Sequence, residues 1–221
     1  MSLHKIFQAI DLWLEETKID VASNTLNLSK PTIVKLYKKF REVIGYYFVN
    51  NLELIDQNNN TLEVGEVMIS GEKYHKGKKI EQKCVIGIID TVTKDVLIKH
   101  IDSKDRQKLK SVIFDAVTEP STISTDIWKE YLNVFDDVII DYDDLKNSDN
   151  IKQLVDKASN DSISHVWYHL KNTLRKKSQT NYNNLQGYID EFLWRRKHKN
   201  NKEDMINSFL ELIKINVKIY V

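Results

Sequence analysis

Carboxylates are the side chains of this sequence that could hold a catalytic metal ion. The chain has a single cysteine, Cys84, which excludes a cysteine-based zinc site within one chain, and its six histidines show no metal-ligand spacing. Mg²⁺ takes oxygen ligands, mostly carboxylates together with substrate phosphates. The candidate metal-binding carboxylates are Glu66, Asp126 and Asp161.

Basic residues form local groups in this chain rather than a general excess. Lys and Arg number 33 against 32 Asp and Glu, so the formal net charge of +1 is not that of a strongly basic nucleic-acid-binding protein. If nucleic acid is bound, local patches must contact it. Lys171 with Arg175, and Arg195 with Arg196, are two candidate groups for phosphate contacts; each is also explained as a solvated or dipole-stabilised helix face.

Three helices are predicted for the first fifty residues. Hydrophobic residues recur at helical spacing over 3–16, 18–26 and 30–48, and Ser29 is suited to cap the third helix. This order is typical of a helix-turn-helix, whose third helix enters a DNA groove, although a plain helical packing unit is the alternative. The candidate DNA contacts on that helix are Lys30, Thr32, Lys35, Lys38, Lys39 and Arg41.

The hydrophobic period changes from helical to extended after a polar linker. Segments 62–69, 83–90 and 95–101 have short connections and predict an antiparallel meander, followed by a helix over 103–117. The remaining expected elements are a basic turn at 71–79, short strands at 122–125 and 138–141, and helices at 127–134, 151–158, 161–177, 181–196 and 203–217. Three antiparallel strands, a crossover helix, two short strands and then helices indicate an α/β, RNase H-like mixed sheet flanked by helices.

Several short motifs follow one another along the chain, each occurring once. They are TIVKLYKKFRE at 32–42, LEVGEV at 62–67, KYHKGK at 73–78, VIGII at 85–89, DR at 105–106, TDIWKEY at 125–131, DSISHVWYHLK at 161–171 and YIDEFLWR at 188–195. In this order and at this spacing, the motifs resemble those of Merlin-type DDE transposases of eukaryotes and their bacterial insertion-sequence relatives. The resemblance covers residues 1–198 and implies a DDE integrase-type RNase H-like domain behind a helix-turn-helix.

The resemblance also implies three metal-binding carboxylates, and two of their positions have changed here. Gly65 stands where the family has its first Asp and Ser164 where it has its Glu, whereas Asp126 remains. DDE chemistry is an in-line displacement at a phosphate that uses two Mg²⁺ ions. Because Gly65 supplies no ligand and Ser164 only a neutral hydroxyl, we expect the metal pair to be strongly disfavoured.

Substitute carboxylates are the alternative to a lost site. Glu66 neighbours Gly65, but successive strand residues point to opposite faces, so Glu66 would need a β-bulge to reach the site. Asp161 lies three residues before Ser164 on roughly the same helix face, and His165 is rotated away by about 100°. Asp126 precedes an expected helix and can equally be its N-cap.

The sequence therefore predicts a catalytically inactive, exapted (domesticated) DDE transposase-like protein that binds DNA or acts as a scaffold, without a cofactor. Its expected parts are a helix-turn-helix over 1–50, a linker over 51–60, an RNase H-like domain over 61–200 and a C-terminal helix over 201–221. One alternative is an active DNA transposase or nuclease with Mg²⁺ on Asp126, helped by Glu66 and Asp161. The other is a structural or protein-interaction protein, for example of a virus, that does not bind nucleic acid.

The expected partners are DNA and a second copy of the chain, because transposases of this type work as dimers or larger assemblies. No hydrophobic run approaches the roughly 18–20 residues of a membrane span, so a membrane partner is not expected. The sequence has one cysteine and no recognisable signal peptide, so we expect an intracellular location, in the nucleus or the cytoplasm.

Overall fold

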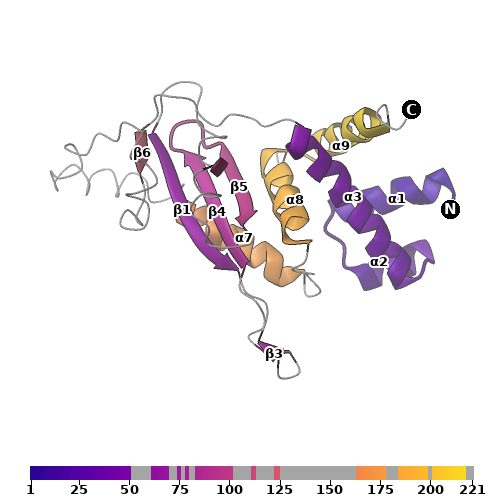
Figure 1. Cartoon of the computed structure of the whole chain (residues 1–221). Helices are drawn as coiled ribbons and strands as arrows, with labels where there is room; N and C mark the ends of the chain where they lie inside the picture. Colours follow the sequence, from indigo (N-terminus) through magenta and orange to yellow (C-terminus); the bar gives the residue numbers. More distant parts are fainter. Residues whose placement is uncertain are drawn as a thin grey trace. The chain divides into compact units, whose positions relative to one another are not determined.

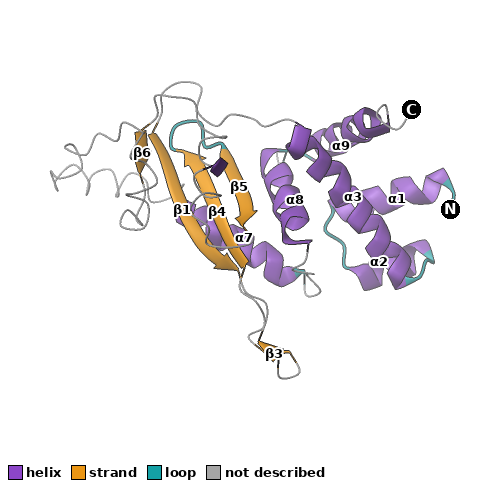
Figure 2. Ribbon diagram, in the orientation of Figure 1, coloured by secondary structure: helices purple, strands orange, loops and turns teal. Residues whose placement is uncertain are grey.

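The structure is a computed structural model that describes residues 1–50, 61–69, 74–75, 78–79, 83–101, 111–112, 122–124, 163–177, 184–198 and 201–217. These residues form two compact units, one of Met1–Asn51 with Asp190–Val221 and one of Leu52–Ile189 (Figure 1). The first unit is helical and the second contains the sheet (Figure 2). The elements expected at 127–134, 138–141 and 151–158 lie outside the described residues.

The helical unit begins with α1 (Leu3–Leu14), α2 (Ile19–Leu26) and α3 (Lys30–Asn50), which confirms the three expected N-terminal helices to within two residues. Asn27 ends α2 in the left-handed region, with a φ of 49°, a conformation that Asn tolerates better than most residues. Ser29 then precedes α3, and its hydroxyl accepts a hydrogen bond from the Thr32 amide at 3.4 Å. The chain thus reverses between α2 and α3 within a few residues.

The C-terminal end of the chain completes this helical unit. The part of α8 (Leu185–Lys197) from Asp190 onward and α9 (Lys202–Val217) belong to it, and α9 packs against α1 and α3. Lys202, at the start of α9, forms ion pairs with Asp11 at 2.7 Å and Glu15 at 2.6 Å on α1. Residues from the two ends of the sequence therefore share one core.

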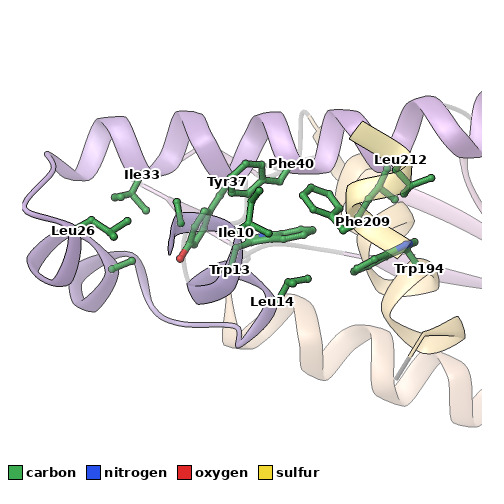
Figure 3. Packing of buried hydrophobic residues seen from close by; sticks show 13 residues of the cluster. Ile10, Trp13, Leu14, Leu26, Ile33, Tyr37, Phe40, Trp194, Phe209 and Leu212 are labelled. Atoms are coloured by element: carbon green, nitrogen blue, oxygen red, sulfur yellow. The ribbon is translucent and has the colours of Figure 1, made fainter. Parts of the chain in front are cut away.

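Four aromatic side chains form the centre of that core (Figure 3). The Trp13 ring contacts Phe40, Phe209 and Trp194, with centroid separations of 5.5, 5.0 and 6.1 Å. Phe209 also meets the Phe40 ring edge to face at 5.6 Å. Because α1, α3, α8 and α9 each contribute one ring, loss of Trp13 would open a cavity between four helices.

The sheet unit is built on three antiparallel strands. These are β1 (Thr61–Ile69), β4 (Lys83–Asp90) and β5 (Val96–Ile101), in the order β5-β4-β1, and they confirm the expected meander. A short strand β6 (Thr122–Ser124) pairs with β1 in parallel. The segment expected to be a basic turn contains a separate two-stranded pair, β2 (Tyr74–His75) with β3 (Lys78–Lys79).

One face of the sheet is covered by α7 (Ile163–Lys176), which packs against β1 and β4 (Figure 1). Helix α8 supplies Gln186 to strand β5, which is at the end of the described sheet order. The Gln186 side chain accepts a hydrogen bond from the His100 amide at 2.8 Å and donates one to the Ile98 carbonyl at 3.4 Å. An amide side chain therefore satisfies part of the strand edge.

No helix in the described ranges is both long and apolar enough to cross a bilayer.

Tyr37 links the stability of the helical unit to pH. Burial raises the pKa of Tyr37 to about 12, an effect that the nearby Arg195 opposes and Glu191 reinforces. The unfolded chain loses this proton near the ordinary value of 10.0, so the folded state binds more protons above that pH. The contribution is fully present below pH 10 and is lost as the pH rises through about 12.

We expect the free energy of unfolding of the wild type to fall between pH 9 and pH 11.5 by about 1–2 kcal/mol more than that of Tyr37→Phe. Urea titrations of both proteins at the two pH values measure the difference, and other titrating groups cancel in the comparison. Equal pH dependence of the two proteins would show that ionisation of Tyr37 is not coupled to folding.

Candidate functional site

Gly65 lies in the middle of β1, directly opposite Gly87 on β4. Both residues belong to the sheet face that α7 covers, because the atoms nearest to a Cβ built on either glycine belong to Ile163 and Trp167 of that helix. Two adjacent strands therefore lack side chains at the same place. The helix fills the space that those two side chains would otherwise take.

Trp167 is the residue that makes a glycine necessary at position 87. A Cβ on Gly87 would lie 2.7 Å from Trp167 Cζ2 and 2.9 Å from Ile163 Cδ1, and would also run into Trp167 Cη2. A Cβ on Gly65 would lie 3.0 Å from Ile163 Cγ2 and 3.4 Å from Trp167 Nε1. Gly87 is thus excluded from carrying a side chain in this packing, whereas at Gly65 a side chain would be tight.

Glu63 is a carboxylate of this face that the sequence analysis missed. It lies two residues before Gly65, so the two residues share a sheet face, and its Oε2 accepts a hydrogen bond from the Ile163 amide at 3.2 Å. That amide is at the N-terminus of α7, where a negative charge is favoured. Because Glu63 lies two residues from Gly65 on an expected strand, this spacing could have identified it as a carboxylate of the same sheet face. Its position in the structure is that of a helix cap.

Glu66 lies beside Gly65 on β1. The β1–β4 register runs without interruption from Leu62 opposite Asp90 to Ile69 opposite Lys83, so this ladder has no β-bulge. Glu66 therefore points to the sheet face opposite that of Gly65. The bulge that Glu66 would need to reach the position of the first carboxylate is absent from this ladder.

Ser164, at the position of the third carboxylate, is exposed in the first turn of α7. Its neighbour Ile163 is buried against Gly65, and Trp167 is buried one turn later. The other two candidates, Asp126 and Asp161, lie outside the described residues. Of the three positions that the family resemblance implies, Gly65 and Ser164 come from elements that pack together, β1 and α7.

The described part of this site does not fit a pair of Mg²⁺ ions. Mg²⁺ requires oxygen ligands in an octahedral arrangement, and carboxylates are the usual protein contribution. No group of three or more His, Cys, Asp or Glu residues that could hold a metal occurs among the described residues. Where a first carboxylate would begin, the Cβ position of Gly65 is in contact with apolar carbon atoms of Ile163.

The basic residues of α7 lie on the exposed side of the helix and along its border with the buried side. Arg175 and Lys176 are exposed and Lys171 is half-buried. None of these three forms an ion pair within the described ranges, and α7 itself contains no Asp or Glu. The helix therefore carries uncompensated positive charge, increasing toward its C-terminal end.

The basic residues of α3 are in a different electrostatic setting. Lys30 forms an ion pair with Asp20 at 2.7 Å, and Lys38 and Lys39 both approach Glu42, at 3.8 and 2.6 Å. These residues are exposed, so the ion pairs are weak and can exchange for phosphate contacts at a small cost. The two other candidates on this helix are Lys35, which is exposed, and Thr32, whose hydroxyl lies 2.8 Å from that of Ser29.

Arg41 and Arg195 have side chains that are largely buried and engaged in internal contacts. The Arg195 guanidinium donates to the carbonyls of Trp13 at 2.7 Å and Leu14 at 2.9 Å, at the end of α1. It also lies 4.7 Å above the Trp13 ring. Both arginines pair with the buried carboxylate of Glu191, at 2.9 Å for Arg195 and 3.5 Å for Arg41. Arg196, like Arg195, is half-buried.

The sheet and the helix across it are compatible with a transposase domain. A model of the ISXO2-like transposase domain matches residues 59–197, which is more than half of the chain. The chain therefore belongs to this family of insertion-sequence DDE transposases. No curated protein matches the chain.

The contact between Trp167 and the paired glycines can be measured by two matched substitutions. We expect Gly87→Ala to lower the free energy of unfolding by about 2–3 kcal/mol, because its Cβ overlaps the indole ring. Gly65→Ala should cost about 1 kcal/mol or less, since its Cβ is only tight against Ile163. Both changes reduce the entropy of the unfolded chain equally, so their difference in urea unfolding reports the folded contact. Equal costs would contradict this packing.

Proposed function

We propose that this transposase-family protein is catalytically inactive and has been exapted to bind DNA. The observation that carries the proposal is the division of α7 into two faces. Its buried face holds Ile163 and Trp167 against the position of the first carboxylate. Its exposed face carries cations and no acidic residue, and begins at Ser164 instead of a third carboxylate.

Loss of catalysis follows from charge as well as from packing. A site for two dications beside a polyanionic substrate needs several negative ligands. Gly65 offers none, and Ser164 offers a neutral hydroxyl. Glu63 is the carboxylate nearest in sequence on the same strand face, and it is engaged with the Ile163 amide of α7. Moving Glu63 onto a metal would expose the helix N-terminus that it now caps.

DNA binding is supported by the exposed side of α7. Lys171, Arg175 and Lys176 recur at helical spacing with no carboxylate of the same helix to neutralise them. Phosphate contacts by such side chains are independent of sequence and release counterions from the DNA. The buried side of the helix is anchored on the sheet, so these cations are presented on a rigid support.

Helix α3 is the second contact that we propose. The reversal at Asn27 and the cap at Ser29 give α2 and α3 the sequence of elements of a helix-turn-helix. Lys35 is exposed, and the ion pairs of the described residues on α3 involve other lysines. Because Lys30, Lys38 and Lys39 first have to leave Asp20 or Glu42, α3 should contribute less than α7.

The architecture behind this function is proposed to be RNase H-like. The order β5-β4-β1-β6, with β6 parallel to β1, and the helix across the sheet support that fold. A homodimer, which the family resemblance implies, is proposed as the binding form. Light scattering on the free protein and on its DNA complex measures the number of copies.

The proposed contact can be tested by two triple substitutions that remove the same charge. Replacing Lys171, Arg175 and Lys176 with Gln should weaken binding to duplex DNA at every sequence tested. Loss of three phosphate contacts should also make the slope of log K against log salt less steep by about 2.7, at about 0.9 for each contact. Fluorescence anisotropy over a range of salt concentrations measures both quantities.

The matched control replaces Lys30, Lys38 and Lys39 with Gln, which changes net charge by the same amount on α3. We expect a smaller loss of affinity and a smaller change in slope, because these lysines already form ion pairs with Asp20 and Glu42 in the free protein. A larger effect in this control than in the α7 variant would place the main contact on α3. Absence of DNA binding by the wild type at low salt would leave a scaffold or protein-interaction role.

Inactivity is tested separately by a nicking assay on supercoiled plasmid with Mg²⁺ or Mn²⁺. We expect the wild type to nick no faster than Asp126→Asn, since a single remaining carboxylate cannot hold the metal pair. Glu63→Gln should also leave the result unchanged. Nicking by the wild type that disappears in either variant would show that a shifted set of carboxylates still supports catalysis.

A further inference from the structure

Two histidines lie one turn apart on the exposed side of α7. His165 and His169 are both exposed, and their Nε2 atoms are 3.1 Å apart. The two rings are almost perpendicular, at 87°, with centroids separated by 4.4 Å. This pair was not expected from the sequence to bind a metal ion, although residues four apart are neighbours on a helix.

The separation of the two nitrogens matches that of two ligands on one metal ion. Zinc–nitrogen bonds are about 2.0–2.1 Å long. Two such bonds place the nitrogens about 3.4 Å apart at a tetrahedral angle and about 2.9 Å apart at a right angle. The observed 3.1 Å lies between these values. Without metal, the same geometry serves a hydrogen bond in which one Nε2 donates to the other.

We propose that His165 and His169 form a binding site for a divalent transition-metal ion such as Zn²⁺, Ni²⁺ or Cu²⁺. Imidazole nitrogen suits these ions, whereas Mg²⁺ takes oxygen ligands, so the site is chemically distinct from that of a DDE transposase. No third His, Cys, Asp or Glu joins the pair among the described residues. The pair leaves further coordination positions of the ion to other ligands, water among them.

The surroundings hold the pair in place. The opposite side of α7 is buried through Val166 and Leu170, which fixes the helix backbone that carries both rings. Tyr168 packs edge to face against His169, with centroids 5.5 Å apart, and limits rotation of that ring. A pre-positioned pair loses less side-chain entropy on binding than two free histidines would. The proposal does not depend on DNA binding or on the loss of catalysis.

Isothermal titration of the full, untagged chain with Zn²⁺, Ni²⁺ and Cu²⁺ in separate experiments tests the site. We expect one ion per chain and at least about a tenfold loss of affinity in His165→Asn and in His169→Asn. His4→Asn is the matched control, because His4 is an exposed histidine on another helix, α1, and its loss should leave affinity unchanged. Asn keeps a polar side chain on an exposed helix face, and far-UV circular dichroism confirms that each variant is folded.

A second measurement reads the nitrogen atoms directly. In ¹⁵N-labelled protein, Zn²⁺ should shift the imidazole Nε2 signals of both His165 and His169 together, and leave those of His4 in place. Equal affinity in the wild type and both pair variants would overturn the site. Binding of one ion by two chains, or a shift confined to other histidines, would overturn it as well.

Discussion

The indole of Trp167 lies across two glycines that face each other on adjacent strands, and the sheet unit depends on this contact. Gly87 cannot carry a Cβ beneath the ring, and Gly65 has little room for one beside Ile163. The contact fixes where α7 crosses β1 and β4, and so determines which side of the helix is buried. That placement also determines which way the exposed side chains of α7 point, from Ser164 to Lys176.

This contact is the physical basis of the proposed loss of catalysis in a chain of the transposase family. The strand and helix that would bring the first and third carboxylates together still pack against each other, but they meet through Gly65, Ile163 and Trp167. Packing of this kind stabilises the domain without any metal ion. The exposed side of the same helix carries the histidine pair and the basic end on which the two proposals rest.

Much of the fold could be predicted from the sequence because hydrophobic periodicity reports which side of an element is buried. The meander, the three N-terminal helices and α7 to α9 follow from it. Periodicity does not say which elements share a core, so the packing of α9 against α1 and α3 could not be foreseen. Charge alone does not reveal the internal pairing of Arg41 and Arg195, because that pairing depends on Glu191 and on the end of α1. Glu63 was missed because its partner, the Ile163 amide, is a hundred residues away.

The Trp167 indole N–H is a direct reporter of the position of the first carboxylate, since its nitrogen would lie 3.4 Å from a Cβ on Gly65. Paramagnetic Mn²⁺ bound by a carboxylate site there would broaden its NMR signal, and the Trp13 and Trp194 indoles of the helical unit serve as internal references. The titration is best made on a variant with His165→Asn and His169→Asn, so that the histidine pair does not contribute. We expect the Trp167 signal to stay as sharp as the other two. Selective broadening of Trp167 at substoichiometric Mn²⁺ would show that a metal site survives and would contradict the account.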